Sequence, residues 1–351
     1  MTSDIALPRY NYRESYDWNY DHAPEPVGIE VPAVPGDWEF FGRRISSPLG
    51  MAAGPLLNGR WILYYASLGY DVLTYKTVRR AARACYPMPN LQPVNAPRIT
   101  GCEPAPASPQ MDGSWAVSFG MPSRGPEIWR ADVEKTRARL AADKVLSVSV
   151  VASPQPGWSL SQLAEDYAVI AQWAVASGAD CIEANFSCPN VQSVDGQLYQ
   201  QPGAGAVVAE RIRDKIGSVP LLIKIGHVTR TELAAQLISE LALFADGLVM
   251  INCIAADVIA PSGEKMFQGE KRGIAGQAIR QPVLDQIQIF NRLIKVAGSK
   301  LKLIGVGGIS TAQDVEAHLQ AGSSSVQLAT AAMLNPGLGI EIRRQLQHRS
   351  V

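Results

Sequence analysis

The segment Leu303-Ile304-Gly305-Val306-Gly307-Gly308, read on to Met333 as LIGVGGISTAQDVEAHLQAGSSSVQLATAAM, decides the predicted fold. A buried strand ends in glycines, and a helical stretch and a second strand ending at Thr330 follow it. Glycines let backbone amides approach an anion closely, and Thr330 stands beside a helix amino terminus. Two loops of this kind form the recurring phosphate cup of β/α barrels. A structural turn would explain one glycine pair but not both halves of the cup.

The same alternation of strand and helix extends outward from this segment. We predict strands at residues 49–54, 71–77, 144–152, 181–187, 220–226, 247–253, 302–308 and 324–330. Helical stretches lie between and after them, at residues 59–68, 127–142, 159–176, 203–216, 230–243, 282–296, 311–320 and 337–346. Most strands are nearly continuous apolar runs, such as LLIKI, as expected of parallel strands buried on both faces. The fold class is therefore α/β, and eight units favour a closed (β/α)8 TIM barrel over an open sheet.

Three segments do not follow the alternation of strands and helices. Residues 1–45 are rich in Tyr, Trp, Asp and Pro without a helical or strand period, and we expect an arm that lies on the barrel domain of residues 46–351 or on a partner subunit. Long insertions follow strand two at residues 78–125 and strand six at residues 254–281. Because loops after barrel strands lie on the catalytic face, both insertions are expected to build or cover the site.

The composition excludes several classes of partner. Basic and acidic residues number 32 each, so no overall field favours nucleic acid or an anionic membrane. The five cysteines include no CxxC pair, which argues against a disulfide framework or a zinc site and favours a reducing cytoplasm. We expect no secretion signal, no membrane-spanning helix and no bound metal, since the histidines show no metal-ligand spacing. Partners must therefore be sought in local sites.

A polar run stands at the end of strand four, from Glu183 to Asn190. Asn185 and Asn190 can exchange hydrogen bonds with amide-like ring atoms, and Cys188 lies just beyond the strand end. A thiol in this position can transfer protons if its surroundings adjust its pKa. The alternative is a buried, inert cysteine.

Two lysines lie in otherwise apolar strands. Lys76 ends strand two and Lys224 lies inside strand five. A lysine among barrel residues needs an anionic or carbonyl partner to offset desolvation, and the N1/O2 edge or ribityl oxygens of a flavin would serve. The alternative is a side chain that reaches solvent. Asn252, at the end of strand six, adds another carboxamide on the same face, and Gly273 with Gly276 suits a tight turn near the phosphate.

These motifs, in this order, resemble the dihydroorotate dehydrogenase family from about residue 47 to residue 346. The resemblance implies FMN as cofactor. It assigns the FMN contacts to Ala52, Ala53, Gly54, Lys76, Thr77, Asn185, Lys224, Asn252, Gly273, Gly307, Gly308, Ala329 and Thr330. Asn95-Ala96-Pro97-Arg98 also looks like the family's Asn-Pro-x-Pro-Arg segment.

Within that family, Ser187-Cys188-Pro189-Asn190 is similar to the soluble class whose base is cysteine. The resemblance implies that a cyclic substrate exchanges hydride with flavin N5 while Cys188 moves a proton and Lys76 assists. The substrate contacts that it implies are Lys76, Val117, Phe119, Gly120, Met121, Asn185, Asn190, Asn252 and Cys253. It also implies a cytoplasmic homodimer. The sequence does not identify the electron acceptor or donor.

The chain departs from the family pattern at two places. Val117 occupies the position of a substrate-binding asparagine, and losing such a carboxamide typically costs about 1 to 3 kcal/mol. Residues 191–196 lack the Pro-Gly pair common in the gating loop of the soluble class. A relative acting on another pyrimidine, lactam or enone therefore stands beside dihydroorotate dehydrogenase as an interpretation.

Two further classes of function remain open from the sequence. A flavin-free barrel enzyme resembling inosine-monophosphate dehydrogenase would also use a glycine-built phosphate cup and a cysteine, and a yellow colour would separate the two. A binding protein that has lost turnover is suggested by Val117 and opposed by Cys188. No G-x-G-x-x-G fingerprint follows a strand, so a nicotinamide would need a partner protein or the flavin pocket itself.

Overall fold

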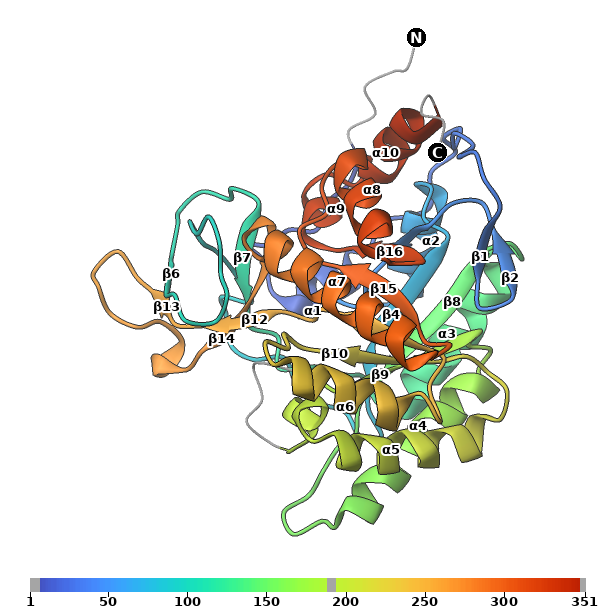
Figure 1. Cartoon of the computed structure of the whole chain (residues 1–351). Coiled ribbons are helices and arrows are strands. Elements are labelled where there is room, and N and C mark those ends of the chain that lie inside the picture. Colours follow the sequence, from blue (N-terminus) through green and yellow to red (C-terminus); the bar gives the residue numbers. More distant parts are fainter. Residues whose placement is uncertain (1–6, 188–193, 348–351) are drawn as a thin grey trace.

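The predicted barrel is confirmed. The computed structural model describes residues 7–187 and 194–347, and eight parallel strands close into one barrel in chain order (Figure 1). The barrel strands are β3 (Leu49–Met51), β4 (Val72–Val78), β8 (Val145–Val150), β9 (Cys181–Asn185), β10 (Leu221–Ile225), β11 (Gly247–Met250), β15 (Lys302–Val306) and β16 (Ser325–Leu328). Pairing of β16 with β3 completes the ring, so the sheet has no free edge.

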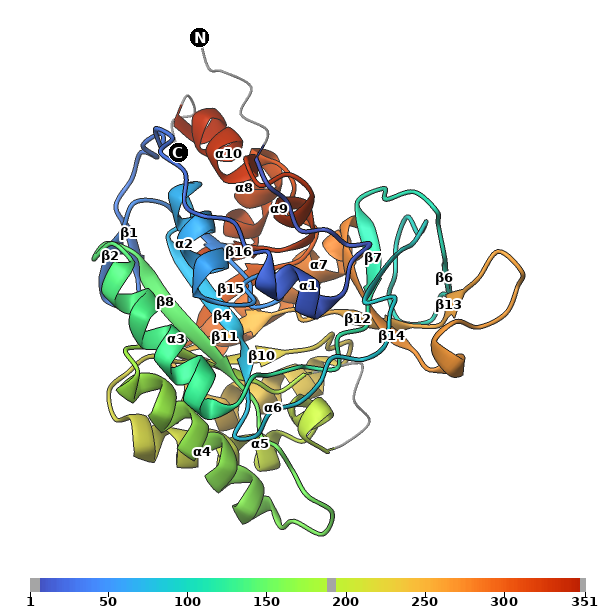
Figure 2. The same ribbon diagram turned by 180° about the vertical axis from the view of Figure 1, so that it is seen from behind.

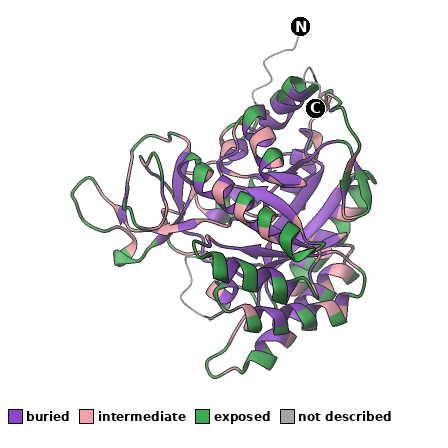
Figure 3. Ribbon diagram, viewed as in Figure 1, coloured by how far each residue is buried: buried purple, intermediate pink, exposed green. Residues whose placement is uncertain are grey.

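Helices pack around the outside of the barrel, and the buried faces of strands and helices form a continuous core (Figure 3). They are α2 (Gly59–Ser67), α3 (Pro126–Arg139), α4 (Leu160–Ala176), α5 (Pro202–Ile216), α6 (Thr231–Leu241), α7 (Arg280–Ala297), α8 (Ala312–Ala321) and α10 (Leu338–Gln347). Two helix starts carry a Ser or Thr three residues before a Gln or Asp, which is the sequence pattern of a capping box. Ser159 with Gln162, and Thr311 with Asp314, form reciprocal capping boxes at the starts of α4 and α8.

Most barrel strands end earlier than predicted; residues 52–54, 186–187 and 307–308, for example, follow β3, β9 and β15 and do not belong to them. Asn252 and Cys253 were placed in strand six, whereas β11 ends at Met250 and both residues belong to the loop that follows. Thr330 was placed at the end of strand eight, but it is the first residue of a short additional helix, α9 (Thr330–Leu334). The strands are shorter because the backbone turns away at the catalytic face, where neighbouring strands diverge and ladder hydrogen bonds end.

The two long insertions pair with each other. The first contains β5 (Leu91–Pro93), β6 (Ala105–Pro106) and β7 (Ser114–Val117), and the second contains β12 (Ile254–Ala256), β13 (Val258–Ile259) and β14 (Arg272–Gly276). They form a four-stranded sheet in the order β12-β14-β7-β5, and β13 pairs with β6. Figure 1 shows these strands together on the left of the barrel. Segments about 150 residues apart in the chain thus build one cover beside the carboxyl ends of the barrel strands.

The amino-terminal segment has regular elements where none was expected. Helix α1 (Tyr16–Asp21) lies between α2 and β7 on the back of the barrel (Figure 2), and the backbone amide of Tyr16 donates to Asn90 at 3.0 Å. Strands β1 (Trp38–Phe40) and β2 (Arg43–Ile45) form a hairpin. Phe40 and Ile45 pack against apolar barrel residues that include Val72 and Leu222, so the hairpin closes the end of the barrel opposite the insertions.

Short 3₁₀ helices lie at Val194–Gln200, Phe267–Gly269 and Gln277–Ile279. Within residues 7–187 and 194–347, no helix combines the length and apolar character needed to cross a membrane.

A buried ionic cluster ties the last helix to the start of the barrel. Asp71 and Arg343 are almost fully buried and their side chains meet at 2.5 Å. The guanidinium of Arg343 also donates to Ser47 at 2.8 Å and to the carbonyl oxygen of Gly69 at 2.6 Å, while Lys144 approaches the other oxygen of Asp71. Buried charges persist only when paired and hydrogen-bonded in this way.

Arg343→Met should therefore destabilise the fold strongly. The substitution leaves the Asp71 carboxylate buried with Lys144 as its remaining cationic partner, and breaking a buried pair from one side costs about 3 to 5 kcal/mol. Urea unfolding followed by circular dichroism measures the loss. Arg44→Met is the control, because the exposed ion pair of Arg44 with Asp37 at 3.4 Å should contribute less than about 1 kcal/mol. Equal midpoints for both variants would contradict the role of the cluster.

Candidate functional site

Two adjacent hollows lie where the barrel strands end beneath the insertion sheet. The inner hollow encloses about 120 Å³ and the outer hollow about 300 Å³. The wall that they share consists of Asn252, Ala275, Val306, Ala329 and Thr330. Because the shared wall belongs to both, one elongated ligand could occupy the two hollows together.

The inner hollow brings together most of the site residues predicted from the sequence. These are Ala52, Ala53, Gly54, Lys76, Thr77, Val117, Phe119, Met121, Asn185, Lys224, Asn252, Cys253, Ala329 and Thr330. Gly307 and Gly308 line the outer hollow instead. Gly120 and Gly273 line neither of the two, and the predicted Cys188 and Asn190 lie outside the described residues.

Both lysines are buried at the hollow and do not extend into solvent. The side chain of Lys76 comes from β4 and its ammonium lies 4.7 Å from the centre of the Phe119 ring. The side chain of Lys224 comes from β10, and its ammonium lies 3.6 Å from the carboxylate of Glu183 on the neighbouring strand β9. Two cations in one pocket favour a ligand with carbonyl or anionic groups.

The described carboxamides converge as the sequence predicted. The side-chain amide of Asn252 donates to the side-chain oxygen of Asn185 at 3.2 Å and to the carbonyl oxygen of Ser187. The side-chain oxygen of Asn185 also accepts from the backbone amide of Ser187 at 3.2 Å. These bonds hold both carboxamides in place beside Lys224, the strand partner of Asn185. Polar groups for a planar amide-like ring are therefore set in advance.

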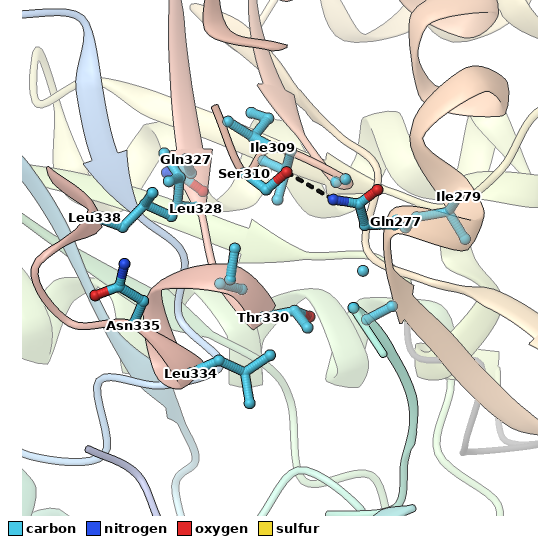
Figure 4. A pocket seen from close by; sticks show the side chains of 18 of the residues that line it. Gln277, Ile279, Ile309, Ser310, Gln327, Leu328, Thr330, Leu334, Asn335 and Leu338 are labelled. Carbon is cyan, nitrogen blue, oxygen red and sulfur yellow. Dashed lines mark hydrogen bonds between the residues drawn. The ribbon is translucent and has the colours of Figure 1, made fainter. Parts of the chain in front are cut away.

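The outer hollow has the features of an anion cup. Gly307 and Gly308 have φ values of +128° and +72°, a conformation in which successive amides can turn toward one side. Figure 4 shows Gln277 reaching Ser310 at 2.7 Å across the hollow, and Thr330 at the start of α9 faces it. The described lining includes one carboxylate, Glu341, which is an exposed residue and accepts from Asn335 at 3.0 Å.

Gly273 does not form the tight turn that was expected near the phosphate. It lies within β14 directly opposite Val117 of β7, whereas Gly276 has the positive φ of +100° and lines the outer hollow. A Cβ at Gly276 would stand 2.1 Å from the carbonyl oxygen of Gly113, so the close approach of the two insertions requires glycine there. Of the two glycines predicted for the turn, Gly276 has the turn conformation and Gly273 does not.

The sequence predicted that the insertions would build or cover the site, but it did not identify several residues that cover the inner hollow. Leu91, Trp115 and Ala275 line it from β5, β7 and β14, next to Val117 and Phe119. None of these apolar residues carries a signal of its own, because each is ordinary for a buried strand. Only the pairing of the two insertions places them over the polar residues of the barrel.

The described cysteines differ in their surroundings. Cys253 lines the inner hollow and is partly exposed. Burial raises the pKa of Cys85 to about 11, although nearby Lys76 opposes this shift. Cys85 is therefore a thiol at neutral pH and not a ready nucleophile. His227 lines neither hollow, and burial lowers its pKa, so its imidazole is neutral at pH 7.

The family follows from a match over most of the chain. A family model described as dihydroorotate dehydrogenase matches residues 37–349. The chain belongs to the dihydroorotate dehydrogenase family. Membership makes it an oxidoreductase, in agreement with the resemblance in its motifs.

Individual members of the dihydroorotate dehydrogenase family are distant but match over long stretches. The chain is 27% identical to a dihydroorotate dehydrogenase of Dictyostelium discoideum, covering 97% of this chain and 98% of the relative. It is 29% identical to a dihydroorotate dehydrogenase (quinone) of Pseudarthrobacter chlorophenolicus, covering 91% and 86%. The ligand-free crystal structure of DHODH from Eimeria tenella has a TM-score of 0.74 at 17% identity, covering 94% and 91%, which supports the fold alone.

Gly308→Ala should cost more stability than the backbone conformation alone explains. A Cβ at Gly308 would lie 2.6 Å from the Cα atom of Arg280, so the start of α7 must shift. Gly42→Ala is the matched control, because Gly42 has a φ of +84° with nothing within 4 Å of the added Cβ. We expect about 1 to 2 kcal/mol for the control and a larger loss for Gly308→Ala in urea unfolding. Equal losses would mean that the cup tolerates a side chain.

Proposed function

We propose that this member of the dihydroorotate dehydrogenase family is an FMN-dependent oxidoreductase that acts on the carbon–carbon bond of dihydroorotate or a similar cyclic amide. The observation that carries the proposal is that the two hollows are adjacent and share five lining residues. A glycine-built cup lies next to a pocket of lysines and carboxamides. FMN is a ligand with a phosphate at one end and a polar, planar ring at the other, so both ends find suitable partners.

The residues present fit FMN in their chemistry. The cup of Gly307, Gly308 and Thr330 suits the phosphate, because its backbone groups can donate and no described carboxylate other than the exposed Glu341 lines it. Lys224 would face a carbonyl edge of the ring system, and Ala52, Ala53, Gly54 and Thr77 would contact it with small side chains. When bound, FMN supplies an acceptor for hydride at its ring.

The protein's own groups would hold the substrate and move its proton. Lys76, Asn185 and Asn252 lie close enough together to bind the polar edge of a small ring. Asn190 and Cys188 follow Ser187 in sequence, and we assign them to substrate binding and proton transfer by their family resemblance. The insertion sheet covers this pocket with Leu91, Trp115 and Ala275, which would exclude water during the reaction.

The relatives differ in the electron acceptor that their names give, so they do not identify the acceptor of this chain. One relative is a quinone type, and another, 30% identical over 52% of this chain, is a catalytic subunit of an NAD(+) type from Bacillus pumilus. The family match argues against the flavin-free barrel enzyme that remained open from the sequence. A homodimer and a cytoplasmic location stay predictions.

An anaerobic reduction experiment tests the proposal. The purified protein should show the visible spectrum of a flavin, and dihydroorotate should bleach it because hydride passes from the substrate to the flavin. Dihydrouracil and NADPH, added separately, show whether another donor reduces the flavin faster. A colourless protein that takes up no FMN would refute the cofactor assignment. A bound flavin whose spectrum dihydroorotate does not bleach would point to a different cyclic substrate.

Cys188→Ser should slow turnover while FMN stays bound. A serine hydroxyl gives up its proton far less readily than a thiol, and loss of a general acid or base typically costs about 10²- to 10⁴-fold in rate. Rapid-mixing measurements of flavin reduction give the rate, and the visible spectrum gives the occupancy. Cys102→Ser is the control, since Cys102 is exposed and lines neither hollow. An unchanged reduction rate would remove Cys188 from the mechanism.

Val117→Asn should improve the use of dihydroorotate. Val117 lines the inner hollow between Leu91 and Gly273 of the insertion sheet, so a carboxamide there would reach the substrate pocket. One added hydrogen bond to a polar substrate corresponds to about 5- to 100-fold in kcat/KM. Val117→Leu is the apolar control. If both variants change kcat/KM equally, the side chain at position 117 does not form a polar contact with the substrate.

A further inference from the structure

Glu183 is a buried carboxylate behind Lys224 of the inner hollow, and the proposed reaction does not use it. It lies on β9 two residues before Asn185, with 0% of its surface exposed. Neither of its carboxylate oxygens has a hydrogen-bond partner among the described residues. The ion pair that the described structure gives it is with Lys224, at 3.6 Å.

This arrangement is unusual for a structural ion pair. A buried carboxylate ordinarily accepts several hydrogen bonds, because desolvation is costly when only one partner offsets it. The strand neighbour of Glu183 on β8, Ser149, has its hydroxyl engaged at 2.9 Å with Thr77. Asp71 shows the usual pattern, since hydroxyl and cationic groups surround both of its oxygens. A buried polar group without hydrogen-bond partners calls for an explanation, and a role at a functional site is one such explanation.

We propose that Glu183 is a positioning residue that acts through Lys224, holding its ammonium at the floor of the pocket and offsetting its charge beneath the bound ring. The inference rests on the proposed binding of FMN with a carbonyl edge of its ring toward Lys224. The side chain of Lys224 lines the inner hollow, whereas Glu183 does not, so the carboxylate acts on the ligand through the lysine.

The consequence is electrostatic. Two electrons and one proton convert oxidised flavin to its anionic reduced form, which places one negative charge on the ring. A lysine beside the ring stabilises that charge, and a carboxylate 3.6 Å behind the lysine weakens the effect. Glu183 therefore keeps the reduction potential of the flavin lower than Lys224 alone would set it, which favours passage of the electrons to an acceptor.

Glu183→Gln tests this with a side chain of nearly the same shape and no charge. We expect the midpoint potential of bound FMN, measured by anaerobic reductive titration against a reference dye, to shift in the positive direction. Glu165→Gln is the matched control, because it removes a carboxylate that pairs with Arg211 at 2.5 Å on the outside of the barrel, away from both hollows. A potential equal to that of the parent protein in Glu183→Gln would overturn the inference.

Two further variants keep the test decisive. If Glu183→Gln fails to fold, Glu183→Asp is the second variant, because it retracts the carboxylate by one methylene. We expect a smaller positive shift of the midpoint potential. The absence of a shift would refute the proposal. In the background of Lys224→Gln, measured with FMN in excess, Glu183→Gln should shift the potential less than it does in the parent protein. An equal shift in both backgrounds would show that Glu183 does not act through Lys224.

The failure of the two proposals can be told apart. A parent protein that binds no FMN would refute the proposed function before any potential is measured. A parent protein that binds FMN and is bleached by its substrate, with a potential insensitive to Glu183, would refute the positioning role alone.

Discussion

Closure of eight parallel strands into one ring is the constraint on which the rest of this structure depends. In a closed parallel barrel, all strands point the same way, so their carboxyl ends meet on one face and their inward side chains share one interior. Lys76, Asn185 and Lys224 come from three different strands, and the register between β9 and β10 sets Asn185 directly opposite Lys224. A shift of one residue in either strand would turn one of these side chains away from the hollow.

The two insertions complete what the barrel begins. The barrel contributes the polar floor of the inner hollow, while β5, β7 and β14 contribute apolar side chains over it. The exchange of backbone hydrogen bonds between β7 and β14 fixes the position of this cover, because Gly276 permits a close approach that a larger residue would prevent. A polar floor beneath an apolar cover suits a ring that is bound by its amide edge and shielded from water.

Two of the buried carboxylates, Asp71 and Glu183, have opposite surroundings. At the end of the barrel near the β1–β2 hairpin, Asp71 is surrounded by Ser46, Ser47, Lys144 and Arg343, and the cluster joins the last helix to the first strands. Near the hollow, Glu183 faces Lys224 with few other partners. The first arrangement stabilises the fold because the charges are satisfied internally. The second arrangement leaves the ammonium of Lys224 available to pair with a ligand in the hollow.

The amino-acid sequence by itself determined the barrel, the glycine turn after β15 and the polar residues at the strand ends. Apolar runs of strand length, capping boxes such as Thr311 with Asp314, and glycines at positions 307 and 308 are local signals, and each acts within a few residues. The family resemblance also came from short motifs in order, which the match over residues 37–349 confirms.

Tertiary structure alone decided which residues form the cover, the helix at the amino terminus and the ion-pair partner of Lys224. Leu91 and Ala275 line one hollow because strands from two distant insertions pair, and no local pattern encodes a contact between segments so far apart. The sequence likewise predicted that Lys224 needs an anionic or carbonyl partner and suggested a flavin for it, but only the register of β9 against β10 identified Glu183. Long-range pairing depends on the closed geometry of the whole sheet, whereas strand and helix signals depend on neighbours along the chain.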